Sequence, residues 1–113
     1  MRYFEESEFM MGKENVFHKM DSIFLTRLDL LRALVNEPLS ITSSFRSEDY
    51  NSNIKGSSKR SYHLKGRAVD LKCNNGTLRR KITQNALKLG LSVGVAKNFI
   101  HIDNRTNQIV FTY

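Results

Sequence analysis

Two histidines and an aspartate in the second half of the chain have the types and spacing of a metal-binding set. The segment SYHLKGRAVDL holds His63 and, seven residues later, Asp70, and the segment NFIHID holds His101. Zinc accepts imidazole nitrogen and carboxylate oxygen, and a catalytic zinc commonly has three protein ligands with a fourth position left to water. The sequence therefore predicts a zinc site of His63, Asp70 and His101, with Gly66 allowing the turn between the first two.

Acidic residues are scarce around this set. Residues 57–113 contain eleven Lys or Arg but only two acids, Asp70 and Asp103, and each acid lies close in sequence to a histidine. Alternation along FIHID places His101 and Asp103 on one face of a strand, away from the two isoleucines. Asp103 is therefore expected either to orient a zinc ligand from behind or to act on the water that zinc binds.

Each of these residues, taken alone, also has a structural explanation. A single histidine in a strand is more often structural than metal-binding, Asp70 could pair with a nearby basic residue, and Asp103 could begin a turn over residues 104–107. His18 has no supporting pattern, and Cys73, as the only cysteine, excludes a thiolate cluster and an internal disulfide. The combination is more specific than its parts, so zinc binding is the favoured interpretation.

Periodicity and helix-breaking residues predict the elements of the first half. Residues 21–36 carry an apolar stripe at helical spacing, with Asp21 as the N-cap, which indicates an amphipathic helix. Pro38 prevents its continuation, and LSITSS has the β-branched and hydroxyl residues of a short strand. Residues 45–60 are polar, and we expect a long loop there or a loop with one short helix.

The second half is expected to alternate strands with one helix. RAVDLK indicates a strand, and Thr77 is the expected cap of a helix that ends at Gly90. LSVGV, NFIHID and QIVFTY indicate three further strands, the last two joined as a hairpin through residues 104–107. These elements predict an α+β fold, a small and largely antiparallel sheet with helices on one face, as a single domain over residues 1–113.

Composition and charge narrow the classes of function. No apolar run approaches the roughly 18 residues of a membrane span, and the start, with three glutamates among its first eight residues, does not resemble a secretory signal. Residues 1–56 hold seven Lys or Arg and nine acids, a net charge of −2, whereas residues 57–113 carry +9. That basic half is either a solvated surface or a contact for polyanions. Nucleic acid is the weakest candidate, because no binding motif or aromatic stacking platform accompanies the charge.

Three motifs together resemble the zinc D-alanyl-D-alanine carboxypeptidase family, which is VanY-like and shares its fold with the hedgehog signalling domain. SYHLKGRAVDL fits S-x-H-x-x-G-x-A-x-D, SITSSFRSEDYN is similar to the family's S-x-x-R-S segment, and NFIHID is similar to its F-V-H-x-D strand. The motifs occur in the family's order over most of the chain. The resemblance implies that His63, Asp70 and His101 are zinc ligands in a hedgehog/D-Ala-D-Ala peptidase-like fold.

The resemblance also implies roles for residues outside the zinc set. Arg46 would contact a substrate carboxylate or the carbonyl under attack, which suits the fixed fork of donors of a guanidinium group. Ser44 and Ser61 would be supporting hydrogen-bond donors. Without the family, Arg46 is equally compatible with a surface ion pair to Glu48 or Asp49.

One position departs from the family pattern. Several relatives place a glutamate or aspartate three residues before the last histidine ligand as general base, and here that position is Asn98. An amide does not accept a proton usefully at neutral pH. Asp103 is the best remaining candidate for the base, with Glu48 or Asp49 behind it. If none of them serves, the domain is expected to bind zinc and substrate without turnover, which hedgehog-type relatives show is possible for this fold.

The expected function is that of a zinc peptidase that cleaves peptide bonds in peptidoglycan stem peptides or cross-links. Zinc would activate its bound water and polarise the scissile carbonyl, Asp103 would remove the proton, and Arg46 would hold the substrate. The size and the start of the chain suit a monomeric phage endolysin, released through a holin, or a tail-associated enzyme carried in the virion. The alternative is a non-catalytic zinc domain with a structural or binding role, which Asn98 favours.

Overall fold

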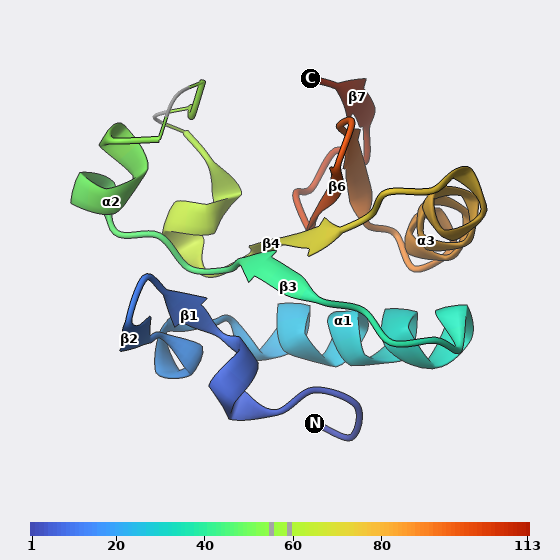
Figure 1. The fold of residues 1–113 in the computed structure, drawn as a ribbon, viewed down its shortest axis with the longest axis horizontal. Helices are drawn as coiled ribbons and strands as arrows, with labels where there is room; N and C mark the ends of the chain where they lie inside the picture. The colour runs from blue at the N-terminus through green and yellow to red at the C-terminus, as the bar shows by residue number, and fades with distance from the viewer. Residues whose placement is uncertain (55, 59) are drawn as a thin grey trace.

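The computed structural model describes residues 1–54, 56–58 and 60–113 of the chain (Figure 1). In chain order the elements are the 3-10 helix η1 (Glu6–Glu8), β1 (Met10–Met11), β2 (Glu14–Asn15), the 3-10 helix η2 (Phe17–Lys19), α1 (Ser22–Val35), β3 (Ile41–Ser43), α2 (Glu48–Ser52), the 3-10 helix η3 (Tyr62–Lys65), β4 (Ala68–Lys72), α3 (Gly76–Lys88), β5 (Ser92–Val95), β6 (Phe99–Asp103) and β7 (Val110–Thr112). The α+β class predicted from the sequence is confirmed. None of these helices is long and apolar enough to cross a bilayer.

The main sheet has five strands in the order β3-β4-β6-β5-β7. All neighbouring pairs are antiparallel except β5 and β7, which are parallel. β4 and β6 lie next to each other inside the sheet, and their register places Asp70 directly opposite His101. Two residues 31 positions apart in sequence therefore become neighbours on one face of the sheet.

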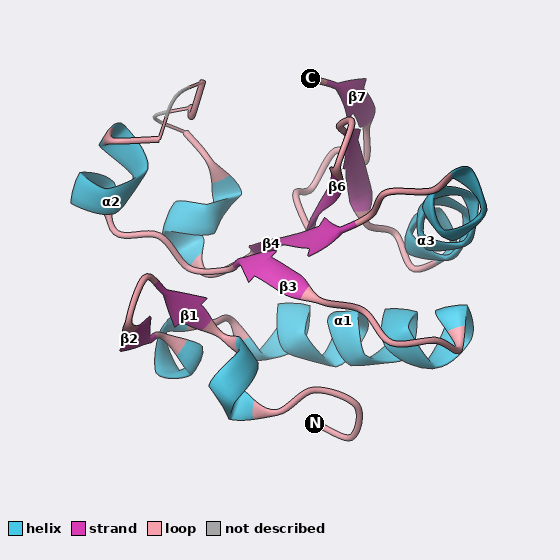
Figure 2. Cartoon of the chain, viewed as in Figure 1, coloured by secondary structure: helices cyan, strands magenta, loops and turns pink. Residues whose placement is uncertain are grey.

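The two long helices cover the apolar face of the sheet. α1 runs beneath the sheet in Figure 2 and packs against α3. The predicted stripe of α1 is buried, from Phe24 to Val35, and Ile100 and Ile102 of β6 join the same core. Alternation along β6 then turns His101 and Asp103 to the opposite side, as the sequence predicts.

Two sequence-based predictions about the second half are wrong. The cap of α3 is Asn75 rather than Thr77, because the Asn75 side chain accepts a hydrogen bond from the Leu78 N–H at 2.8 Å and the helix begins at Gly76. The strands β6 and β7 do not form a hairpin. β6 already has β4 on one edge and β5 on the other, so β7 crosses over and pairs with the free edge of β5.

The other predicted elements are confirmed. α1 begins after Asp21, whose side chain accepts the Phe24 N–H, and the strands around residues 41, 70, 93 and 101 are all present. The described residues of the polar segment 45–60 contain one short helix, α2. The segment before β4 forms η3, which the sequence analysis did not predict.

Candidate metal centre and cleft

His63 is fixed by η3 and by the turn that follows it. Ser61 caps η3, since its Oγ accepts the His63 N–H at 3.2 Å. Gly66 ends the turn with a φ of 67°, and its carbonyl accepts the Asp21 N–H at 2.9 Å. A Cβ at this position would lie 2.1 Å from the Lys19 carbonyl oxygen, so only glycine fits. The close contact of η3 with the start of α1 therefore sets where His63 lies.

The three predicted ligands meet at one point. His63 Nε2 and His101 Nδ1 each lie 3.2 Å from the same oxygen, Asp70 Oδ1. One donor atom from each of the three residues lies within 4.8 Å of the others. All three side chains are at least nine-tenths buried, so the donors are held closely rather than presented on mobile chains.

Outer hydrogen bonds decide which nitrogen of each histidine is free. His63 Nδ1 lies 2.7 Å from the Ser44 carbonyl oxygen, and His101 Nε2 lies 2.7 Å from Asp103 Oδ2. A carbonyl and an ionised carboxylate only accept hydrogen bonds, so both outer nitrogens carry hydrogen. The inner nitrogens of neutral rings then direct lone pairs at Asp70. Three acceptors that converge in this way suit a cation between them, and the donor set fits zinc.

In the metal-free cluster, the histidines and acids shift one another's pKa values. Burial by itself raises the pKa of Asp70, but the hydrogen bonds and charges of His101 and His63 outweigh it and hold that pKa well below its usual range. Burial by itself lowers the pKa of His101, yet its contacts with Asp103 and Asp70 raise it above the ordinary value. The cluster thus favours positive charge on the His101 imidazole in the absence of metal.

Asp103 lies behind His101 rather than in front of it. Its side chain is fully buried, and Arg105 contacts both of its oxygens, with Nε at 2.9 and 3.1 Å and Nη2 at 2.5 Å. Burial would raise the pKa of Asp103, but the hydrogen bonds from His101 and Arg105 keep it well below its usual range. Of the two roles predicted for Asp103, this geometry supports orientation of a zinc ligand and offers no open path from its carboxylate to the cleft.

Arg46 packs directly against the predicted zinc ligands. It donates from Nη2 to Asp70 Oδ2 at 3.1 Å, from Nε to Ser43 Oγ at 3.0 Å and from Nη1 to Asn51 Oδ1 at 3.3 Å. Its backbone N–H also donates to the His63 carbonyl. Its carboxylate partner is thus Asp70, and within the described ranges no ion pair with the acids of α2 forms.

The two predicted serines have different surroundings. Ser61 lines the cleft in addition to capping η3. Ser44 is fully buried, and among the described residues its Oγ has no hydrogen-bond partner, while its carbonyl oxygen holds His63. The described geometry gives Ser44 a contact with His63 and gives Ser61 a position in the cleft wall.

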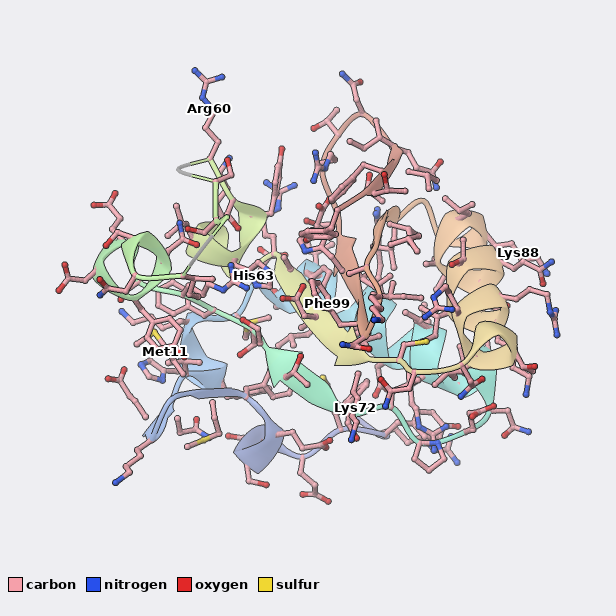
Figure 3. The ribbon with its side chains drawn as sticks, turned by 45° about the horizontal axis from the view of Figure 1, so that its top comes forward. Met11, Arg60, His63, Lys72, Lys88 and Phe99 are labelled. Carbon is pink, nitrogen blue, oxygen red and sulfur yellow. The ribbon has the colours of Figure 1, made fainter. Side chains whose placement is uncertain are left out.

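A cleft of about 1210 Å³ opens above the three ligands. Tyr50 and Ile54, from α2 and the residues after it, form one wall, and Phe99, Phe111 and Tyr113 form another; His63 and Phe99 are labelled in Figure 3. Burial raises the pKa of Tyr113 to about 12, so its hydroxyl stays protonated at neutral pH.

Asp70 is the one acidic side chain that lines the cleft within the part of the chain that the structure describes. Glu48 and Asp49 are exposed on α2 and do not line the cleft, and Asn98 is exposed outside it. Asp103 thus lies behind His101, outside the cleft. Glu48 and Asp49, the other two candidates for the general base, also lie outside it.

Sequence reasoning missed several residues of this site. Arg105 contacts Asp103 and packs over the rings of Tyr62 and Phe111, at 5.1 and 5.3 Å from their centroids. The i, i+2 spacing of an acid and an arginine after the last histidine was an available signal. The aromatic wall from β7 depended on the crossover of that strand, which periodicity alone does not reveal.

Comparison with known proteins identifies one family. The family model described as Peptidase M15 matches residues 2–103. No curated protein matches the chain. The family match includes all three converging ligands and ends at Asp103, before Arg105 and β7.

Proposed function

The chain belongs to the peptidase M15 family, and from this premise we propose that it cleaves peptide bonds in the stem peptides or cross-links of bacterial peptidoglycan. Membership supports a zinc-dependent metallopeptidase. The observation that carries the proposal is the convergence of His63, Asp70 and His101 at the base of a large cleft. Peptide bonds between D-residues, as in a D,D-carboxypeptidase or endopeptidase, are the proposed substrate class.

The residues around the ligands have separable roles in this reaction. Zinc bound here supplies a Lewis acid for the scissile carbonyl and a nucleophilic water at neutral pH. The Ser44 carbonyl and Asp103 hold the two imidazoles with their ligand nitrogens facing inward. Asp103, which the sequence predicts as the best candidate for the general base, is therefore proposed to act through His101 as a positioning residue.

Two further groups are placed to meet a peptide in the cleft. Arg46 uses three hydrogen bonds to fix its guanidinium against Asp70, and its remaining N–H donors are available to a substrate carboxylate or a developing oxyanion. Ser61 and Tyr113 line the cleft with hydroxyl groups, and each hydroxyl can donate a hydrogen bond to a bound peptide.

The test combines metal content with a product assay. Purified protein should contain about one zinc per chain, His63→Ala should lose it, and the zinc-loaded protein should release new amine termini from purified peptidoglycan. Asp49→Asn, an exposed change on α2 outside the cleft, is the control that should leave both properties intact. Absence of zinc would refute the metal site, and zinc without cleavage of several wall chemistries would refute the peptidase.

A non-catalytic zinc domain is the second candidate function. It is favoured by Asn98 and by the absence, among the described cleft residues, of an acidic side chain other than Asp70. Zinc at one per chain together with peptide binding but no hydrolysis would select this candidate. For the setting, we propose a phage lysis or tail-associated enzyme that acts at the cell wall as a monomer, which rests on analogy within the family.

A further inference from the structure

A second cavity lies beside the catalytic cleft and is lined by three arginines. Its volume is about 620 Å³, and its walls come from the start of α1, the turn between η3 and β4, the residues after α3 and the residues after β6. The arginines are Arg27, Arg67 and Arg105, and Arg105 also lines the catalytic cleft. The two cavities therefore share one cationic side chain.

Two of these arginines lack a carboxylate partner in the described part of the chain. Arg67 donates from Nε to Asn104 Oδ1 at 2.7 Å and from Nη2 to the Asn104 carbonyl at 3.0 Å, and both acceptors are uncharged. The guanidinium of Arg27 has no hydrogen bond or ion pair to any described residue, and it lies beside Gly90, where a Cβ would be 3.9 Å from Nη1. Arg105 is the third arginine, and its charge is offset by Asp103.

The remaining charges of the cavity leave it positive. Asp21 is the one acid in the described lining, and its Oδ2 already accepts the Phe24 N–H at the N-terminus of α1. The 14-residue helix adds partial positive charge at this same wall. Arg67 and Arg105 both pack over the ring of Tyr62, at 5.3 and 5.1 Å, which fixes their positions before any ligand arrives.

We propose that this cavity is a subsite for an oxyanion group, phosphate or carboxylate, on the polymer whose peptide enters the catalytic cleft. Guanidinium groups bind both kinds of oxyanion bidentately. Because Arg105 borders both cavities, an anionic group close along the polymer from the scissile peptide can occupy the subsite. The assignment of the anion to this polymer rests on the proposed function, whereas the proposal that the cavity binds an oxyanion does not.

The first test titrates inorganic phosphate into the zinc-loaded protein at constant ionic strength, with amide NMR shifts as the readout. Amides around Arg27, Gly90 and Asn104 should shift with one dissociation constant, and Arg27→Gln should raise that constant about fivefold, the scale of one partly exposed charged contact. Arg80→Gln removes the same charge from the exposed face of α3, where Arg80 contacts Gln84, and should change it less than twofold. Shifts confined to the zinc ligands, or equal weakening by both variants, would overturn the proposal.

The second test identifies the source and separates this inference from the proposed function. Binding to purified peptidoglycan is measured by sedimentation, with phosphate-containing wall polymers retained or removed. Arg27→Gln should bind peptidoglycan roughly fivefold more weakly than Arg80→Gln. If this difference disappears when the phosphate polymers are removed, the bound group is phosphate. If it persists, the bound groups are peptide carboxylates. If the two variants bind equally well in both preparations, the subsite proposal is refuted. Hydrolysis of a short soluble stem peptide should be unchanged in the control Arg80→Gln, and a wild-type protein that binds in this pattern but never hydrolyses would refute the peptidase alone.

Discussion

At the residue scale, the centre of this protein depends on hydrogen bonds that lie one step behind the ligands. The Ser44 carbonyl and the Asp103 carboxylate leave the inner nitrogens of His63 and His101 free to bind a cation. Hydrogen bonds from His101 and Arg105 in turn hold the pKa of Asp103 low, so that it stays ionised. Such outer partners typically change metal affinity by 10- to 100-fold when they are removed.

Asp103→Asn is therefore expected to weaken zinc binding by about 10- to 100-fold. The amide keeps the shape of the carboxylate but loses the negative charge that strengthens His101 as a ligand and that Arg105 requires. Zinc affinity is measured by competition with a chromophoric chelator. Asp49→Asn makes the same chemical change at an exposed site on α2 and should have no effect. Unchanged zinc affinity together with a lost kcat would instead make Asp103 the proton acceptor of the reaction.

The pH dependence of the metal-free protein follows from the same contacts. The pKa values of Asp70 and Asp103 are lowered, so their stabilisation is present above the ordinary carboxyl pKa of about 4 and is lost as pH falls. The pKa of His101 is raised, so its stabilisation is complete below about pH 6.5 and is lost as pH rises through the raised value. The cluster therefore contributes most between about pH 4 and 6.5.

Urea midpoints from pH 3 to pH 9, with chelator and with zinc, check this prediction. With chelator the midpoint should fall on both sides of that window. With zinc it should stay high toward alkaline pH, because the metal needs the neutral imidazoles that high pH provides. His18→Gln, at an exposed histidine of η2, should leave both profiles unchanged. A metal-free midpoint that rises steadily from pH 6 to pH 8 would contradict the prediction.

At the element scale, the contact between the turn after η3 and the start of α1 positions His63. Gly66→Ala should destabilise the protein by about 2–3 kcal/mol, because it adds backbone strain at positive φ and places a methyl group against the Lys19 carbonyl. Gly12→Ala is a matched control: its φ is +60° and the nearest atom to an added Cβ is 4.0 Å away. It should cost about 1–2 kcal/mol. Equal losses in urea midpoint for the two variants would show that the close contact does not matter.

Much of this element framework could be predicted from the sequence. The stripe of α1, its Asp21 cap and the alternation along β6 are local signals, and all three are confirmed. The ligand set was also readable, because His63 and Asp70 stand in a recognisable motif and His101 in another. These features depend on residues close together in the chain.

The remainder depended on competition between distant segments. β7 pairs with β5 because both edges of β6 are occupied. The residues at 104–107 do not predict this pairing. The cap of α3 moved to Asn75 because asparagine is a better N-cap than threonine and its side chain reaches the Leu78 N–H. To predict that Asp103 lies behind His101, one would have had to know its contact with Arg105. That contact depends on the alternation along β6 and also on the conformation of the loop after it.

At the scale of the whole molecule, the three ligands tie separate parts of a small domain together. His63 comes from η3, Asp70 from β4 and His101 from β6, so a bound ion connects the sheet to the segment that packs on α1. A chain of 113 residues has one modest core and a small net stability. Zinc binding should therefore be a large fraction of the free energy of unfolding.

Zinc is expected to raise the thermal unfolding midpoint by about 10 °C when free zinc is about 100 times its dissociation constant. Binding to the folded state at that ratio contributes about 2.7 kcal/mol, and a domain of this size gains about 4 °C per kcal/mol. His63→Ala should lose most of the shift, whereas His18→Ala, at an exposed histidine outside the cluster, should keep it. Melting of each variant with chelator shows whether it folds. An equal rise in the midpoints of both variants would place the stabilising zinc somewhere other than the His63, Asp70 and His101 cluster.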